Sequence, residues 1–166
     1  MLQKLIFKWL FRLKIKKNRI QVEGFKDIKN IVIINNLDEK KTCDLEALTY
    51  SFQKLGKKVE SIGVSLSSRS NEDTKVVSKK DFSFFGKSKT PWIREFLNKK
   101  PDYVILIDRS NNYLINHLAI QCEANCYIGY KSIPQNELLT LQIAPLLENE
   151  QEVFLRYIKL IEGSYE

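Results

Sequence analysis

The chain has 166 residues, of which 43% are hydrophobic and 28% charged, and its formal net charge is +7. This length suits one domain with a substantial core, and this composition excludes an intrinsically disordered chain. Its three cysteines are an odd number and lack metal-finger spacing. We therefore expect a reducing, cytoplasmic compartment and no disulfide framework.

The positive charge is concentrated at the N-terminus. Residues 1–19 hold seven lysines and arginines and no acidic residue, which leaves 20 basic residues against 20 acidic ones in the remainder. Basicity therefore characterises a short arm, residues 1–22, and not the body of the protein.

Helical spacing predicts that this arm is a basic amphipathic helix. One broad apolar face comprises Leu2, Leu5, Ile6, Trp9, Leu10 and Leu13. Phe7, Phe11 and Ile15 interrupt the polar side. The residues expected to bind a partner are Lys4, Lys8, Trp9, Arg12, Leu13, Lys16 and Lys17.

Three hypotheses account for the arm. Its apolar face docks on the domain or on a second copy of the chain, or the helix lies in an anionic membrane interface, or its charges bind RNA phosphates. Every apolar run is too short and too interrupted by charge to span a bilayer, and a small-residue cleavage site is absent, which argues against a secretory signal.

Downstream, apolar β-branched runs alternate with segments of helical periodicity. We expect strands at 31–35, 59–66, 102–108, 126–130 and about 138–143, helices at 45–55, 91–100, 112–124 and 150–163, and an exposed loop at 67–77. Nearly all-apolar strands that alternate with helices indicate a mostly parallel sheet covered on both faces. The prediction is a small three-layer Rossmann-like α/β domain over residues 25–166, preceded by the arm.

Part of this pattern resembles a known set of proteins. The stretch KKDFSFFGKSKTPWIREFLNKKPDYVILID, followed by NYLINHLAIQCEANCYIGY, resembles an uncharacterised family of Bacteroidota proteins, over roughly residues 25 to 160. That family has no established activity, so the resemblance implies a fold only. More distantly, the strand, helix and Gly-containing strand from 101 to 130 look like the acceptor half of heptosyltransferase-type glycosyltransferases. Such enzymes need a second Rossmann-like half, which this length cannot hold.

The segment FSFFGKSKT (82–90) has one glycine, whereas a phosphate-binding loop needs several. We interpret Phe82, Phe84 and Phe85 as packing residues, with Gly86 at positive φ. Lys87 and Lys89 precede a helix and are candidate anion ligands.

The most polar cluster at the end of a predicted strand is Asp108, Arg109, Ser110 and Asn111, where open α/β sheets bind ligands. The structural alternative is that Ser110 or Asn111 caps the next helix while Asp108 accepts hydrogen bonds from loop amides. The first strand-to-helix loop, 35–44, has no glycine, which argues against a dinucleotide, and Asp44 or Thr42 is its expected helix cap.

Evidence for catalysis is thin. The only histidine, His117, fits a packing position, and Cys122 and Cys126 have no further ligands nearby, so we predict no catalytic residue, no metal and no cofactor. The main hypothesis is a non-catalytic cytoplasmic adaptor or binding module. The arm would recruit it to a protein or to the inner face of a membrane. The alternatives are a degenerate sugar- or nucleotide-binding domain related to a glycosyltransferase half, and an RNA- or ribosome-associated protein.

Overall fold

The computed structural model describes residues 2–15, 24–39, 43–67, 75–130, 138–143 and 156, with the side chains of the first segment described for 2–11. The helices are α1 (Leu2–Ile15), α2 (Leu45–Lys54), α3 (Pro91–Leu97) and α4 (Tyr113–Gln121), with a 3-10 turn η1 (Lys79–Asp81). The strands are β1 (Asn30–Asn36), β2 (Lys58–Ser65), β3 (Val76–Ser78), β4 (Tyr103–Ile107), β5 (Cys126–Tyr130) and β6 (Leu141–Ile143).

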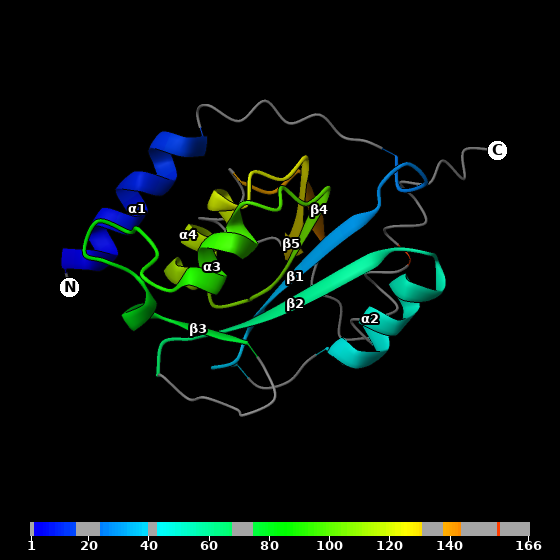
Figure 1. Ribbon diagram of the computed structural model, residues 1–166, viewed down its shortest axis with the longest axis horizontal. Coiled ribbons are helices and arrows are strands. Elements are labelled where there is room, and N and C mark those ends of the chain that lie inside the picture. The colour runs from blue at the N-terminus through cyan, green and yellow to red at the C-terminus, as the bar shows by residue number, and fades with distance from the viewer. Residues whose placement is uncertain are drawn as a thin grey trace.

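The six strands form one sheet in the order β3-β2-β1-β4-β5-β6, and every pair is parallel. The chain winds outward from β1 in one direction and from β4 in the other, so the strand order reverses between these two neighbours (Figure 1). This arrangement confirms the predicted small Rossmann-like α/β domain with an N-terminal helix. It also places the carboxyl ends of β1 and β4 side by side.

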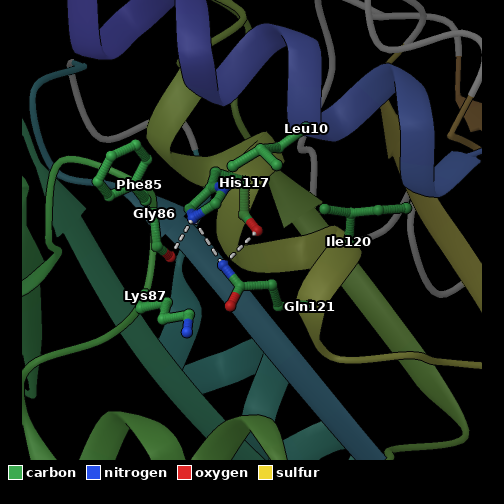
Figure 2. A pocket seen from close by; sticks show the side chains of 7 residues that line it. All are labelled: Leu10, Phe85, Gly86, Lys87, His117, Ile120 and Gln121. Atoms are coloured by element: carbon green, nitrogen blue, oxygen red, sulfur yellow. Dashed lines mark hydrogen bonds between the residues drawn. The ribbon is translucent and has the colours of Figure 1, made fainter.

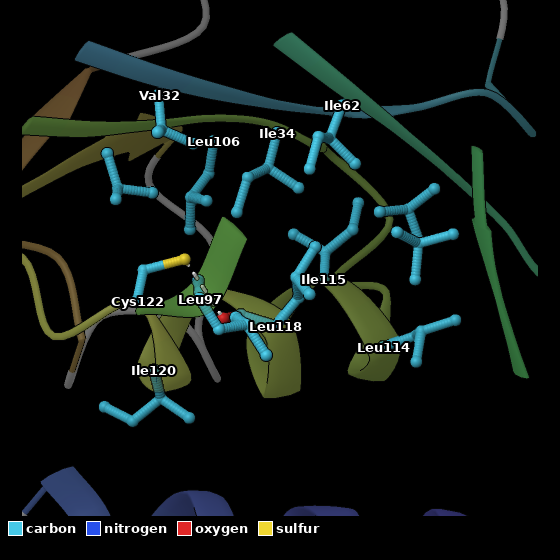
Figure 3. Packing of buried hydrophobic residues seen from close by; sticks show 14 of the residues in the cluster. Val32, Ile34, Ile62, Leu97, Leu106, Leu114, Ile115, Leu118, Ile120 and Cys122 are labelled. Carbon is cyan, nitrogen blue, oxygen red and sulfur yellow. Dashed lines mark hydrogen bonds between the residues drawn. The ribbon is translucent and has the colours of Figure 1, made fainter. Parts of the chain in front are cut away.

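Alternate residues of each strand face opposite sides of the sheet. Val32 and Ile34 of β1 pack in a cluster with α3 and α4, whereas Ile31 and Ile33 pack in a second cluster with α2. Figure 3 shows the first cluster, in which strand side chains meet those of α4. Because both faces are covered, the strands read as continuous apolar runs, as the sequence indicated.

Helix ends follow the local sequence. The side chain of Asp44 accepts a hydrogen bond from the N–H of Ala47 and caps α2, as predicted. Gly56, just beyond α2, has a φ of +75°, which suits a residue without a Cβ. Pro91 occupies the first turn of α3, where its missing N–H costs no helical hydrogen bond.

One predicted loop contains a strand. Val76 and Val77, which were expected in the exposed loop 67–77, belong to β3 and pair with Gly63 and Val64 of β2. The polar residues before them concealed a three-residue edge strand. The helix expected over 150–163 lies almost entirely outside the described residues.

The N-terminal helix α1 packs on α4 (Figure 1). Among the side chains described for residues 2–11, Phe7 and Phe11 are buried, and Ile6 packs at the margin of the same cluster. The expected docking face was therefore wrong in part, because the two phenylalanines that interrupt the polar side make the contact. Among the described residues, no helix is both long and apolar enough to cross a membrane.

Candidate functional site

A polar network with a buried centre at Asn36 and Asp108 lies where β1 and β4 end. The Nδ2 amide of Asn36 lies 2.8 Å from Asp108 Oδ1, 2.9 Å from Ser110 Oγ and 3.2 Å from Glu39 Oε1. The side chain of Asp108 is fully buried. The network therefore connects the loop that follows β1 with the loop that follows β4, at the point where the strand order reverses.

Glu39 is the member of this network that the sequence did not reveal. Its carboxylate accepts hydrogen bonds from the backbone N–H groups of Arg109, at 3.1 Å, and Ser110. Burial raises the pKa of Glu39, but hydrogen bonds from Ser110 and from these two amides outweigh it and lower the pKa below its ordinary value. The Glu39 carboxylate thus occupies the backbone N–H groups of Arg109 and Ser110, so an anionic ligand could bind these amides only by displacing it.

For Asp108, in contrast to Glu39, burial outweighs the hydrogen bonds and the pKa is raised. Burial raises its pKa above the ordinary value, and hydrogen bonds from Asn36 and from the N–H of Asn112, at 2.7 Å, oppose the shift. Asp108 also accepts from the Ser110 N–H and hydroxyl. The predicted structural role of Asp108, accepting from loop amides, is therefore what its contacts show.

The cap of α4 differs from the expectation by one or two residues. Asn112, not Ser110 or Asn111, is the N-cap, and its side chain accepts from the Leu114 N–H at 2.9 Å. Asn111 has a φ of +56° and accepts a hydrogen bond from Asn116. The left-handed backbone conformation of Asn111 turns the chain so that Asn112 meets the N-terminus of α4. Sequence spacing alone could not show which of the adjacent polar residues is the cap.

Arg109, the remaining residue of the predicted cluster, is exposed and lies over the ring of Tyr130, 5.1 Å from its centroid. Burial is the largest cause of a raised pKa for Tyr130. The predicted residues 108–111 thus lie together at the carboxyl end of β4, where Asp108 and Ser110 bind each other and Asn36, and Asn111 binds Asn116.

The segment 82–89 forms a tight turn beside α1. Phe82 is buried and Gly86 has a φ of +78°, as predicted. Phe84 and Phe85 are exposed, so their expected packing role was wrong: the turn directs both rings outward. Lys87 and Lys89 are also exposed, and the turn contacts α1 and α4 instead of the Asp108 network.

A pocket of about 180 Å³ lies between this turn, α1 and α4 (Figure 2). Its lining residues are Leu10, Phe85, Gly86, Lys87, His117, Ile120 and Gln121. Nε2 of His117 lies 2.9 Å from Gly86 O and 2.7 Å from Gln121 Nε2. The buried imidazole thus joins the turn to α4, which agrees with its interpretation as a packing residue.

The outer side of α1 is exposed. Leu2, Leu5 and Trp9 retain 60%, 56% and 61% of their accessible surface. Lys4 and Lys8 are also exposed, and Lys4 Nζ lies 5.7 Å from the ring centroid of Tyr113 on α4. At 100° per residue, the three apolar residues lie opposite the docked Phe7 and Phe11. The side chains of Arg12 and Leu13, and residues Lys16 and Lys17, fall outside what the structure describes.

Residues 3–161 match a family described as Family of unknown function (DUF6913). The chain belongs to this family. No curated protein and no solved structure matches it. In the described part of the chain, no cluster of three or more His, Cys, Asp or Glu residues has a geometry that would hold a metal ion.

Proposed function

We propose that the protein is a non-catalytic peripheral binding module whose helix α1 holds the domain on an anionic membrane surface. The observation that carries this proposal is the exposed apolar stripe of Leu2, Leu5 and Trp9 on a helix that is already docked through its other side. Docking on the domain explains Phe7 and Phe11. It does not explain three large apolar side chains on the outer face.

Charge favours a lipid surface as the occupant. The first 19 residues carry seven basic side chains and no acidic one, and Lys4 and Lys8 are exposed on the flank of α1 between the apolar stripe and the docked side. A helix in the membrane interface buries its apolar side chains at the acyl boundary, while each nearby lysine contributes about 1 kcal/mol on an anionic leaflet. The arrangement therefore supplies both interactions that interfacial binding requires.

The other occupants fit less well. A second copy meeting this face would bring two basic helices together, and like charges oppose that contact. RNA phosphates would bind the lysines, but they would not account for the exposure of Trp9 and its aliphatic neighbours. The three cysteines are buried and form no disulfide with one another, which is consistent with the cytoplasmic face of a membrane as the proposed location.

The test is co-sedimentation of the full chain with phosphatidylcholine vesicles, with and without phosphatidylglycerol. Leu5→Gln with Trp9→Gln should abolish binding, because it removes apolar surface that is exposed in the free protein. Lys4→Gln with Lys8→Gln should weaken binding to anionic vesicles only. Tyr50→Gln is the matched control, since Tyr50 is 58% exposed and lies on α2, across the sheet (Figure 1).

Other outcomes would contradict the membrane proposal. If the wild-type protein binds RNA, and the variant with Lys4→Gln and Lys8→Gln loses that binding while the Leu5 and Trp9 variant keeps it, the arm is an RNA-binding element. If the Leu5 and Trp9 variant dissociates a dimer and the wild-type protein ignores all vesicles, the face is an interface between copies of the chain or with another protein.

A second candidate is a sugar- or nucleotide-binding site of the kind expected from the distant glycosyltransferase resemblance. The polar groups at the ends of β1 and β4 favour it, but an anion at the Arg109 and Ser110 amides must displace Glu39. A nucleoside diphosphate should then raise the melting temperature of Glu39→Ala more than that of the wild-type protein. No shift in either protein would eliminate this candidate.

A further inference from the structure

The turn that follows η1 presents two aromatic rings to solvent. Phe84 and Phe85 are 47% and 72% exposed, and their rings meet edge to face with centroids 5.5 Å apart. Exposed adjacent phenylalanines cost solubility unless a partner covers them. Neither ring contributes to the buried cluster under the turn, which is served by Phe82.

This turn is fixed beside α1. The side-chain amide of Gln3 donates to Ser83 O at 3.2 Å, and a Cβ at Gly86 would lie 3.1 Å from Leu10 Cδ1. In Figure 2, Phe85 lies next to α1, on the other side of His117 from Ile120. The turn that carries the aromatic pair therefore packs against the side of α1 that holds Gln3 and Leu10.

Three backbone N–H groups of the turn are paired within it. Ser83 N–H donates to Lys87 O at 2.8 Å, Gly86 N–H donates to Ser83 O at 3.0 Å, and Lys87 N–H donates to the Ser83 hydroxyl. An apolar environment penalises unpaired peptide groups by several kcal/mol each, so these three hydrogen bonds reduce the cost of bringing the turn to a membrane interface. Positions 82–90 also contain Lys87 and Lys89 and no acidic residue, which matches an anionic surface.

We propose that Phe84 and Phe85 form a second membrane-anchoring element, which enters the interface of an anionic bilayer alongside the outer face of α1. This inference rests on the proposed membrane binding of α1 and specifies how the domain is oriented. Two anchors on different segments fix a rigid body against rotation about the helix axis, which α1 alone does not. The sheet edge, α3 and α4 then have one defined orientation relative to the lipid.

The first experiment compares vesicle partitioning of the full-length wild-type protein, Phe84→Ser with Phe85→Ser, and Tyr50→Ser as the control, on phosphatidylcholine–phosphatidylglycerol vesicles. The double variant should bind about tenfold or more weakly, because burying even one such ring is worth at least the free energy of a tenfold change. The control should bind like the wild type. Equal binding by the double variant and the wild type would overturn the second anchor while leaving α1 as the first.

The second experiment locates residue 85 directly. In a Trp9→Phe, Trp92→Phe background, Phe85→Trp leaves a single indole at the tip of the turn, and vesicles with bromine-labelled acyl chains quench an indole that enters the bilayer. We expect strong quenching and a blue shift. Vesicle-bound protein without quenching would contradict the inference alone, whereas a wild-type protein that binds no vesicle would contradict both the inference and the proposed function.

Discussion

The ring of Phe7 stacks on the imidazole of His117, with centroids 3.9 Å apart and planes inclined by 16°. This contact attaches α1 to α4 and fixes the rotation of α1 about its own axis. With Phe7 and Phe11 turned inward, helical geometry turns Leu2, Leu5 and Trp9 outward. The exposed apolar stripe is therefore a consequence of how the helix docks.

Removal of the buried ring should destabilise the protein far more than removal of the exposed one. Phe7→Ala deletes a buried aromatic side chain and should lower the free energy of unfolding by about 3 kcal/mol or more. Trp9→Ala should change it by about 0.5 kcal/mol or less. Urea unfolding of both variants measures the difference, and equal losses would show that α1 is not docked through Phe7.

Two glycines with similar backbone conformations offer a matched test of the turn beside His117. A Cβ at Gly86 would lie 2.7 Å from His117 Cε1, whereas at Gly56 it would meet nothing within 4 Å, and both residues have positive φ. Gly56→Ala should cost about 1 kcal/mol from backbone strain alone, and Gly86→Ala clearly more. Similar melting temperatures for the two variants would mean that the turn does not pack on His117 as described.

The polar network at the ends of β1 and β4 should stabilise the fold in a pH-dependent way. Asn36→Ala removes a donor to Asp108 and should cost about 1–3 kcal/mol at neutral pH. Asn35→Ala is the control, because Asn35 has no side-chain hydrogen bond among the described residues.

The sign of the pH dependence follows from Asp108, whose raised pKa means that its burial favours the protonated form. The Asn36 hydrogen bond stabilises the ionised form. The advantage of wild-type protein over Asn36→Ala is therefore full above the folded-state pKa of Asp108 and shrinks as the pH falls through it. A difference that stays constant from neutral pH down to values near 3.8 would contradict a folded-state pKa of Asp108 above its ordinary value of 3.8.

Most of the architecture was predictable because each strand carries its own signal. Runs such as 103–107 are apolar throughout, since helices cover both faces of the sheet. The helix stop at Gly56 and the helix start at Pro91 are local signals. The missed strand β3 is only three residues long. It depends on pairing with β2, which is tertiary information.

The candidate sites were less predictable for related reasons. Glu39 reaches amides 70 residues away in sequence, and no pattern around it indicates that contact. The docking face of α1 was misjudged because periodicity favoured the broader apolar face. The rings that Phe7 contacts, those of His117, Phe82 and Tyr113, come from other parts of the chain. Phe84 and Phe85 were expected to be buried because aromatic side chains usually pack in the core. Aromatic content does not show, however, in which direction a turn points its side chains.

Thiol reactivity provides a further check on the core. Burial raises the pKa of Cys43 and of Cys126 to about 11, and Cys122 is also buried. The native protein should therefore react slowly with a thiol reagent at pH 8–9, while the denatured chain exposes all three thiols.

The same pKa shifts make stability decrease with rising pH. Between the ordinary thiol pKa of 9.0 and about 11, the unfolded chain binds fewer protons than the folded one, so the free energy of unfolding falls.

For the labelling experiment, rapid reaction of one thiol in the native protein at pH 8 would contradict the described packing around that thiol.

The most direct test of the membrane proposal is made at Trp9 itself. In the full chain with Trp92→Phe, Trp9 is the sole indole, and it is 61% exposed in the free protein. Phosphatidylcholine–phosphatidylglycerol vesicles should shift its emission to the blue, bromine-labelled acyl chains should quench it, and added salt should weaken both effects. The contradicting result is an unchanged emission spectrum. If the folded protein at low salt gives the same spectrum with every vesicle composition, α1 does not bind membranes.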